Sequence, residues 1–183
     1  MSRHLDHDWF SEPLPANVII GDRSWLYSTY AFRHYYSRQP IGLRVGHDTG
    51  LYNGTFFDLG PMGEVSIGDY CTLVGAIVCC NGRVDIGDYT FIAHEVVIAD
   101  SFAAIPGIEQ LPGHAAAQSE SLLPAGGIVI GENVWIGARA VLLGGARIGA
   151  GAIIGAAAVI DFDVPPHAIA VGNPARIVKK LQS

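Results

Sequence analysis

The chain has 183 residues, of which 50% are hydrophobic and 15% are charged, and this length and composition suit one domain with a substantial core. Its net charge of −6 offers no basic field to a polyanion, and no run approaches the ~20 apolar residues that span a bilayer. We therefore expect no nucleic-acid partner and no membrane contact. The three cysteines indicate neither a disulfide framework nor a metal site, so we expect a cytoplasmic protein without a metal.

A repeat of six residues runs through most of the chain. The pair Ile-Gly or Val-Gly opens each unit of three hexads, and stepping by six from these pairs meets an apolar residue every time. These residues are Ile20, Leu26, Phe32, Val45, Leu51, Phe57, Ile67, Leu73, Cys79, Ile86, Ile92, Ile98, Ile130, Ile136, Leu142, Ile148, Ile154 and Ile160. A period of six fits short strands and tight turns around a triangular coil. We therefore predict an all-β fold, a left-handed parallel β-helix of about six coils.

The repeat divides the chain into parts that belong to a single domain. A solenoid needs a cap at each end, because its terminal coils would otherwise expose their apolar faces and edges. We expect the carboxy-terminal cap to be a short helical tail. The predicted single domain covers residues 1–183 and consists of an N-terminal arm (1–17), coils one to four (18–98), an extended loop (99–127), coils five and six (128–163) and a C-terminal cap (164–183).

Three excursions interrupt the register. One lies between Phe32 and Val45, a shorter one lies between Phe57 and Ile67, and the longest is the extended loop. An insertion leaves a solenoid at a corner while the coils continue, and a structureless loop of this length is usually functional or disordered. We expect the extended loop to help enclose a pocket.

Aromatic residues are concentrated in the first two coils. We interpret part of this group as core and the rest as a cap over the first coils, with stacking on an acceptor molecule as the alternative. The residues are Trp25, Tyr27, Tyr30, Phe32, Tyr35, Tyr36, Tyr52, Phe56 and Phe57.

Two further segments carry a resemblance to a known family. They read Ile130-Gly-Glu-Asn-Val-Trp-Ile-Gly137 and Asp163-Val-Pro-Pro-His-Ala-Ile-Ala-Val-Gly-Asn-Pro-Ala-Arg176. In these segments the chain resembles the bacterial hexapeptide-repeat acyltransferases, most closely the sugar O-acetyltransferases. The resemblance implies a homotrimer that transfers an acetyl group from acetyl-CoA to a hydroxyl or amine of a sugar or glycosylated small molecule, without a metal and with its sites between subunits.

The catalytic base implied by the resemblance is a histidine. In the maltose and galactoside enzymes it follows the fourth coil, where this chain has Ile98-Ala-Asp-Ser instead. His94, with Glu95 beside it to orient it or hold substrate, resembles the catalytic Ile-Ala-His-Asp segment of the UDP-N-acetylglucosamine acyltransferase. His114 in the extended loop, with Asp100 as its partner, is the second candidate. A solvated corner histidine is the alternative interpretation of His94.

For acetyl-CoA the resemblance implies a site along coils five and six. Small residues there would let the pantetheine arm lie close to the backbone, and a basic cluster at the end of the chain could pair with the phosphates or simply be solvated. The residues are Trp135, Gly137, Ala138, Gly155 and Ala156 for the arm and Arg176, Lys179 and Lys180 for the phosphates.

Other functions stay open at this stage. A nucleotide-amino-sugar N-acetyltransferase has the same fold, and a β-helix protein without activity would explain the missing histidine after Ile98. A γ-carbonic anhydrase would need a metal ligand five residues after His94, where Ala99 cannot serve.

Overall fold

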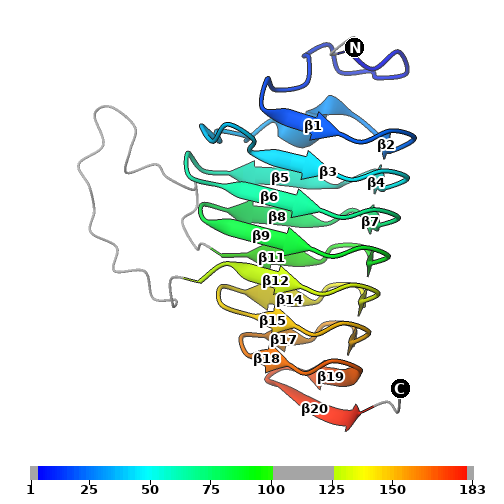
Figure 1. Ribbon diagram of the computed structural model, residues 1–183, viewed down its shortest axis with the longest axis vertical. Helices are drawn as coiled ribbons and strands as arrows, with labels where there is room; N and C mark the ends of the chain where they lie inside the picture. The colour runs from blue at the N-terminus through cyan, green and yellow to red at the C-terminus, as the bar shows by residue number, and fades with distance from the viewer. Residues whose placement is uncertain (1–3, 101–125, 181–183) are drawn as a thin grey trace, which may run out of the picture.

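The computed structural model describes residues 4–100 and 126–180, which form a column of stacked triangular coils (Figure 1). Each full coil contributes one short strand to each of three sheets, so successive strands of one sheet belong to successive coils and pair in parallel. The predicted left-handed parallel β-helix is confirmed. None of the described residues belongs to a helix long and apolar enough to cross a membrane.

Sheets A, B and C are named in the order in which the chain enters them. Sheet A consists of β1 (Val18–Ile20), β3 (Leu43–Val45), β6 (Glu64–Ile67), β9 (Arg83–Ile86), β12 (Ile128–Ile130), β15 (Arg147–Ile148) and β18 (Asp163–Val164). Sheet B consists of β2 (Trp25–Leu26), β4 (Gly50–Tyr52), β7 (Thr72–Val74), β10 (Phe91–Ile92), β13 (Trp135–Ile136), β16 (Ile153–Ile154), β19 (Ala168–Gly172) and β20 (Ala175–Lys180). Sheet C consists of β5 (Phe56–Leu59), β8 (Ile77–Cys80), β11 (Val97–Ala99), β14 (Val141–Leu143) and β17 (Val159–Ile160).

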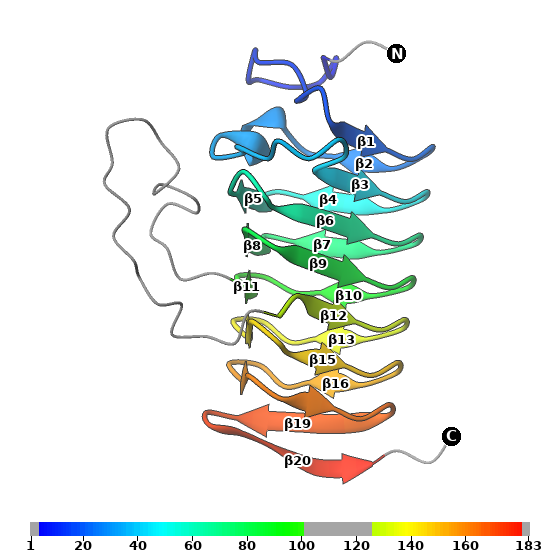
Figure 2. The same cartoon turned by 60° about the vertical axis from the view of Figure 1, so that its left-hand side comes forward.

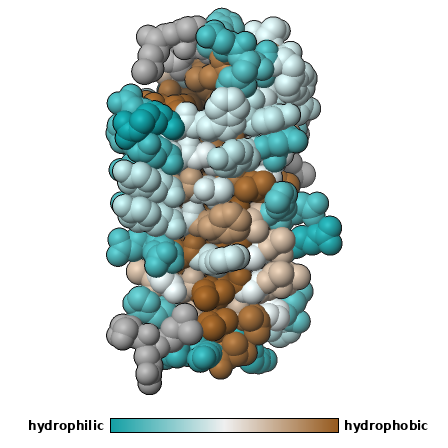
Figure 3. Space-filling model, turned by 90° about the vertical axis from the view of Figure 1, so that its right-hand side faces the viewer, coloured by the Kyte–Doolittle hydropathy of each residue, from teal (hydrophilic) through white to brown (hydrophobic). Residues whose placement is uncertain are grey.

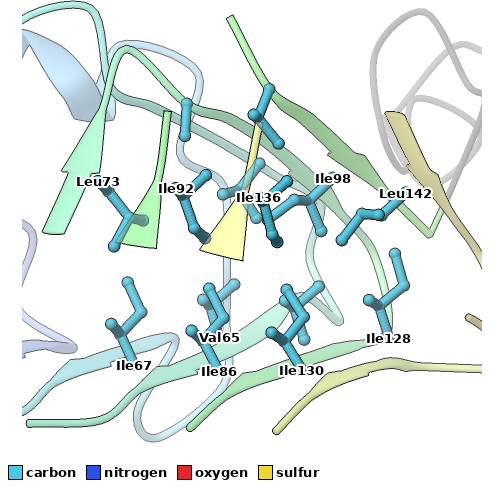
Figure 4. Close-up of a cluster of buried hydrophobic side chains, with 14 of the residues drawn as sticks. Val65, Ile67, Leu73, Ile86, Ile92, Ile98, Ile128, Ile130, Ile136 and Leu142 are labelled. Atoms are coloured by element: carbon cyan, nitrogen blue, oxygen red, sulfur yellow. The ribbon is translucent and has the colours of Figure 1, made fainter. Parts of the chain in front are cut away.

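The core is the narrow space that the three sheets enclose. Figure 4 shows Leu73, Ile92 and Ile136 of sheet B facing Ile67, Ile86 and Ile130 of sheet A. These inward side chains stack in register from coil to coil and are at most 4% exposed. The predicted hexad positions therefore supply most of the core, as expected for side chains that alternate between the two faces of a strand.

One hexad position was predicted wrongly. Val78, and not Cys79, faces the core in β8, where it pairs with Phe57 of the preceding coil and Ile98 of the next. The turn at Gly75, which has a φ of +61°, is one residue shorter than the equivalent turns of those two coils. The shorter turn shifts the strand by one residue, and such a shift exchanges the faces of its side chains.

The C-terminal segment is a strand and not the predicted helical tail. After the turn at Gly172, β20 runs back antiparallel to β19 and adds an edge strand to sheet B. Ile177 and Val178 are β-branched and favour a strand, and β19 offers unpaired backbone groups at the sheet edge. Among the described residues the one helical element is the 3-10 turn η1 (Thr29–Phe32).

The N-terminal arm packs onto the first coils. The Asp8 carboxylate accepts hydrogen bonds from Thr29 N, Thr29 Oγ1 and Ser28 Oγ at 2.6–2.7 Å and from Phe10 N at 3.0 Å. Burial by itself would raise the pKa of Asp8, but these hydrogen bonds lower it to about 2. Phe10 of the arm and Phe56 of the second coil each stack edge-on against Tyr30, so the arm and the first coils share one aromatic cluster.

The predicted excursions leave the solenoid along a single edge. This C–A edge joins sheet C to sheet A and lies on the left in Figures 1 and 2. The turns after η1 and β5 belong to it, and β11 ends on it, one residue before the last residue described in this part of the chain, Asp100. Residues 101–125, which include most of the predicted extended loop, lie outside the described residues.

Candidate functional site

His94 and Glu95 form the turn between β10 and β11, on the edge that joins sheets B and C. Backbone hydrogen bonds hold this turn from both neighbouring coils. The Glu95 N–H donates to the Gly75 carbonyl at 3.0 Å, and the His94 carbonyl accepts from Arg139 N at 2.9 Å. The His94 side chain is exposed, and its ring makes no hydrogen bond to any described residue. A fixed backbone with an uncommitted imidazole is an arrangement that suits a proton acceptor.

Glu95 has a partner other than His94. Its Oε2 accepts a hydrogen bond from Arg139 Nε at 2.7 Å, and this bond raises the pKa of the guanidinium. The φ of Glu95 is +59°, as at other two-residue turns of the solenoid. The predicted orientation of His94 by Glu95 is therefore absent from this arrangement, and the carboxylate faces the next coil along the B–C edge.

Small residues continue the B–C edge directly beyond His94. The Ala157 N–H donates to the Ala138 carbonyl at 2.9 Å, so the turns after β13 and β16 stack beneath the His94 turn. A Cβ at Gly137 would lie 2.6 Å from Ala156 N, and one at Gly155 would lie 2.7 Å from Val171 Cγ1. The structure thus brings His94 together with the four small residues predicted for the pantetheine arm.

Trp135 lies on the outer face of sheet B beside this edge. Its ring is 57% exposed and packs edge-on against Phe91 at a centroid distance of 5.3 Å. Ile153 and Ile169 continue the same outward row on the following strands. Figure 3, which views the molecule from the side where β2, β4 and β7 are labelled in Figure 1, shows hydrophobic residues gathered along this face. The row forms an apolar track that ends at β20.

The basic cluster is carried by β20. Arg176 pairs with Val171 at the end of the strand that adjoins the B–C edge, whereas Lys179 and Lys180 lie further along the strand. All three side chains are exposed. Arg176 is therefore the member of the cluster placed closest to the small-residue turns.

The family described as "Bacterial transferase hexapeptide (six repeats)" matches residues 127–161. These residues carry the hexapeptide repeat of bacterial transferases. A chloramphenicol acetyltransferase of Klebsiella aerogenes is 33% identical over 147 residues, which cover 75% of this chain and 65% of that protein. Relatives from Staphylococcus aureus are 44% identical over 66 residues, so the chain spans about a third of their length (33%).

Solved structures of hexapeptide-repeat proteins show the same fold. A hexapeptide-repeat acetyltransferase from Vibrio cholerae, complexed with acetyl coenzyme A, superposes with a TM-score of 0.61 at 24% identity over 85% of this chain and 77% of that one. A galactoside acetyltransferase in complex with coenzyme A gives a TM-score of 0.58 at 22% identity, over 90% of this chain and 65% of the other.

Asp100 lies on a different edge from His94. Its carboxylate accepts hydrogen bonds from Asn81 N and Gly82 N, both at 2.8 Å, and from Cys80 Sγ at 3.2 Å. These contacts fasten the turn of the preceding coil. Burial, followed by the Asp100 charge, raises the pKa of the Cys80 thiol. His114, its predicted partner, lies outside the described residues.

A pocket on the B–C edge lies between the N-terminal arm and the first two coils. The sequence did not predict that these segments form one pocket. It has a volume of about 200 Å³ and is lined by Trp9, Leu26, Tyr27, Ser28, Tyr30, Ala31, Leu51, Tyr52, Asn53, Gly54, Thr55 and Phe56. Several of its aromatic residues stood out in the sequence. Trp9 did not, because its position depends on the contacts of Asp8 with the coil and not on the repeat.

Proposed function

We propose that this hexapeptide-repeat transferase is an acetyl-CoA-dependent O-acetyltransferase whose acceptor is a hydroxyl group of a sugar or glycosylated small molecule. One observation carries the proposal: the exposed His94 and the turns of small residues at Gly137 and Gly155 lie in succession on one edge. Acetyl transfer from a thioester requires a base next to a surface against which an acyl-pantetheine arm can lie, and turns of small residues offer such a surface.

In the proposed reaction His94 removes the proton from the acceptor hydroxyl as its oxygen attacks the thioester carbonyl. The resulting tetrahedral intermediate collapses by breaking the carbon–sulfur bond, and the departing CoA thiolate takes the proton from the imidazolium. Acetyl ester and CoA are the products, and the enzyme returns to its starting state. Imidazole is suited to both proton transfers near neutral pH.

Acetyl-CoA would lie along the lower part of the B–C edge. We place the pantetheine arm against the small turns, where Ala138 and Ala156 carry no more than a methyl group and are at least partly exposed. Trp135 offers an exposed ring beside the arm, and Arg176 is placed to pair with a phosphate at the end of the track.

We further propose that the protein is a homotrimer in which sheet C meets neighbouring subunits. Its outward residues form a continuous apolar row across all five strands, and such faces usually mark an interface. The row consists of Phe56, Ile77, Val97, Val141 and Val159. Sheet C borders the edge that carries His94, so a neighbouring subunit would form one wall of the site. Sedimentation should show a trimer for the wild type and a smaller species for Val97→Arg, whereas a monomeric wild type would contradict this arrangement.

Steady-state release of CoA thiol from acetyl-CoA, with a panel of neutral sugars as acceptors, tests the proposed activity. His94→Ala should lower kcat by about 10²–10⁴-fold, the usual contribution of a general base. His47→Ala is the matched control, because His47 is an exposed histidine on the A–B edge, which joins sheet A to sheet B. Loss of activity in His114→Ala but not in His94→Ala would move the base out of the B–C edge. No turnover with any sugar in the wild type would refute the proposed function.

A further inference from the structure

The pocket between the arm and the first coils is rich in aromatic side chains. The exposed fractions of its aromatic side chains are 67% for Trp9, 44% for Tyr52, 42% for Tyr27 and 37% for Tyr30. Large exposed aromatic faces grouped around a hollow are uncommon on a surface that has no binding partner. The rings therefore provide a site for a flat or ring-shaped ligand.

The polar groups of the pocket limit the charge of that ligand. None of the lining residues is an aspartate, glutamate, lysine, arginine or histidine. Ser28 Oγ donates to Asp8 at 2.7 Å, and Thr55 Oγ1 donates to the Leu73 carbonyl at 3.3 Å, so both hydroxyls are already engaged. The Asn53 amide is exposed and makes no hydrogen bond to another described residue. Ring faces, phenol hydroxyls and a free amide suit an uncharged ligand that carries hydroxyl groups.

The size of the pocket limits the ligand to a small one. Its volume of about 200 Å³ is below the ~300 Å³ at which pockets for drug-sized ligands begin. The Asp8 hydrogen bonds fix the arm on the coil, and the Trp9 ring lies 5.5 Å from the Tyr30 ring. A pocket of this size with fixed walls has room for one ring of the ligand, with the rest extending along the edge.

The pocket lies on the same B–C edge as His94. A Cβ built on Gly54 would lie 3.2 Å from Gly75 Cα, and one built on Gly75 would lie 4.0 Å from His94 Cα, so the three turns are consecutive. Two strand spacings of ~4.8 Å place the Asn53 turn about 10 Å from the His94 turn. The short turn at Gly75 removes one residue and any side chain from between them.

We propose that this arm pocket binds one ring of an uncharged sugar, and that this sugar is the acceptor whose hydroxyl is presented to His94. The inference rests on the proposed function for the role of the sugar as acceptor. Binding of the sugar itself is independent of acetyl transfer and can be measured alone.

Saturation-transfer NMR without acetyl-CoA tests the binding directly, using methyl glucoside, methyl galactoside and methyl mannoside as probes and glucose 6-phosphate as the charged comparison. We expect transfer to at least one neutral glycoside, a much weaker signal for the phosphate, and about tenfold weaker binding in Trp9→Ala. Trp9→Phe should retain most of the binding, and Tyr89→Ala, an exposed tyrosine on the A–B edge, should retain all of it. A melting temperature measured for each variant reports whether it is folded.

Kinetics separate this inference from the proposed function. Where a sugar is acetylated, Trp9→Ala should raise the KM for that sugar about tenfold and leave the KM for acetyl-CoA unchanged. Turnover whose sugar KM is insensitive to Trp9 would overturn the arm pocket but not the activity. Glycoside binding that depends on Trp9 in a protein with no acetyl transfer would support the pocket as a sugar site and overturn its role in acceptor binding. No binding of any neutral glycoside would overturn the inference entirely.

Discussion

Substitution of Gly137 by alanine tests the placement of acetyl-CoA on the B–C edge. The added Cβ would lie 2.6 Å from Ala156 N and 3.0 Å from both Ala156 Cα and Gly155 C. These are backbone atoms of the next coil, and ordinary carbon contacts are about 3.5 Å or longer, so the turn must move by several tenths of an ångström. Overpacking of this kind costs about 1–3 kcal/mol, which corresponds to a fall in melting temperature of roughly 3–10 °C for a chain of this size.

The displaced turn belongs to the proposed groove for the pantetheine arm. Gly137→Ala should therefore raise the KM for acetyl-CoA at least several-fold while the KM for the acceptor changes little. Gly145→Ala is the matched control, because a Cβ there meets no atom within 4 Å and its φ of +87° makes any side chain strained. Gly145 lies on the C–A edge, away from the proposed acetyl-CoA site. Gly145→Ala should therefore lower the free energy of unfolding by about 1 kcal/mol and leave both KM values unchanged. A Gly137→Ala protein with a lowered melting temperature and an unaltered KM for acetyl-CoA would refute the placement.

Four further substitutions test the fold around the site. Asp8→Asn should lower the melting temperature near neutral pH. The pKa of Asp8 falls from its ordinary 3.8 to about 2 on folding, so the wild type loses stability as the pH drops from about 4 to 2. The variant should lose less stability over that pH range. Val78→Ala should lower the free energy of unfolding, measured with urea, by about 2 kcal/mol, and Cys79→Ala should lower it by less than about 1 kcal/mol. The reverse order would contradict the inward position of Val78. Arg139→Ala removes an exposed ion pair and should leave the urea midpoint of unfolding almost unchanged; a clear fall of that midpoint would show that the pair fixes the His94 turn.

The repeat predicted the core because an inward residue is needed at each side of each coil. Ile92 and Ile136 could be placed from spacing alone, because the turns that precede their strands keep the six-residue step. The same spacing failed at Cys79 because its neighbour Val78 is equally apolar, so the sequence contains no mark of the shortened turn. The C-terminal strand was missed because the basic residues near Lys179 are as compatible with a solvated helix as with an edge strand.

The candidate site was predictable to the extent that it follows the repeat. His94, Ala138 and Ala156 occupy equivalent turns of consecutive coils, so periodicity alone places them on one edge. The partners of Glu95 and Asp100 were not predictable, because each is chosen by side-chain geometry between adjacent coils. The arm pocket likewise depends on where the non-repetitive N-terminal residues pack, and the repeat carries no information about them.

The most direct test of this account is a crystal structure of the protein bound to CoA. The account predicts that the CoA sulfur lies beside the His94 imidazole, with the pantetheine arm against the turns at Gly137 and Gly155 and a phosphate within reach of Arg176. CoA bound along the C–A edge, near Asp100 and away from His94, would contradict it.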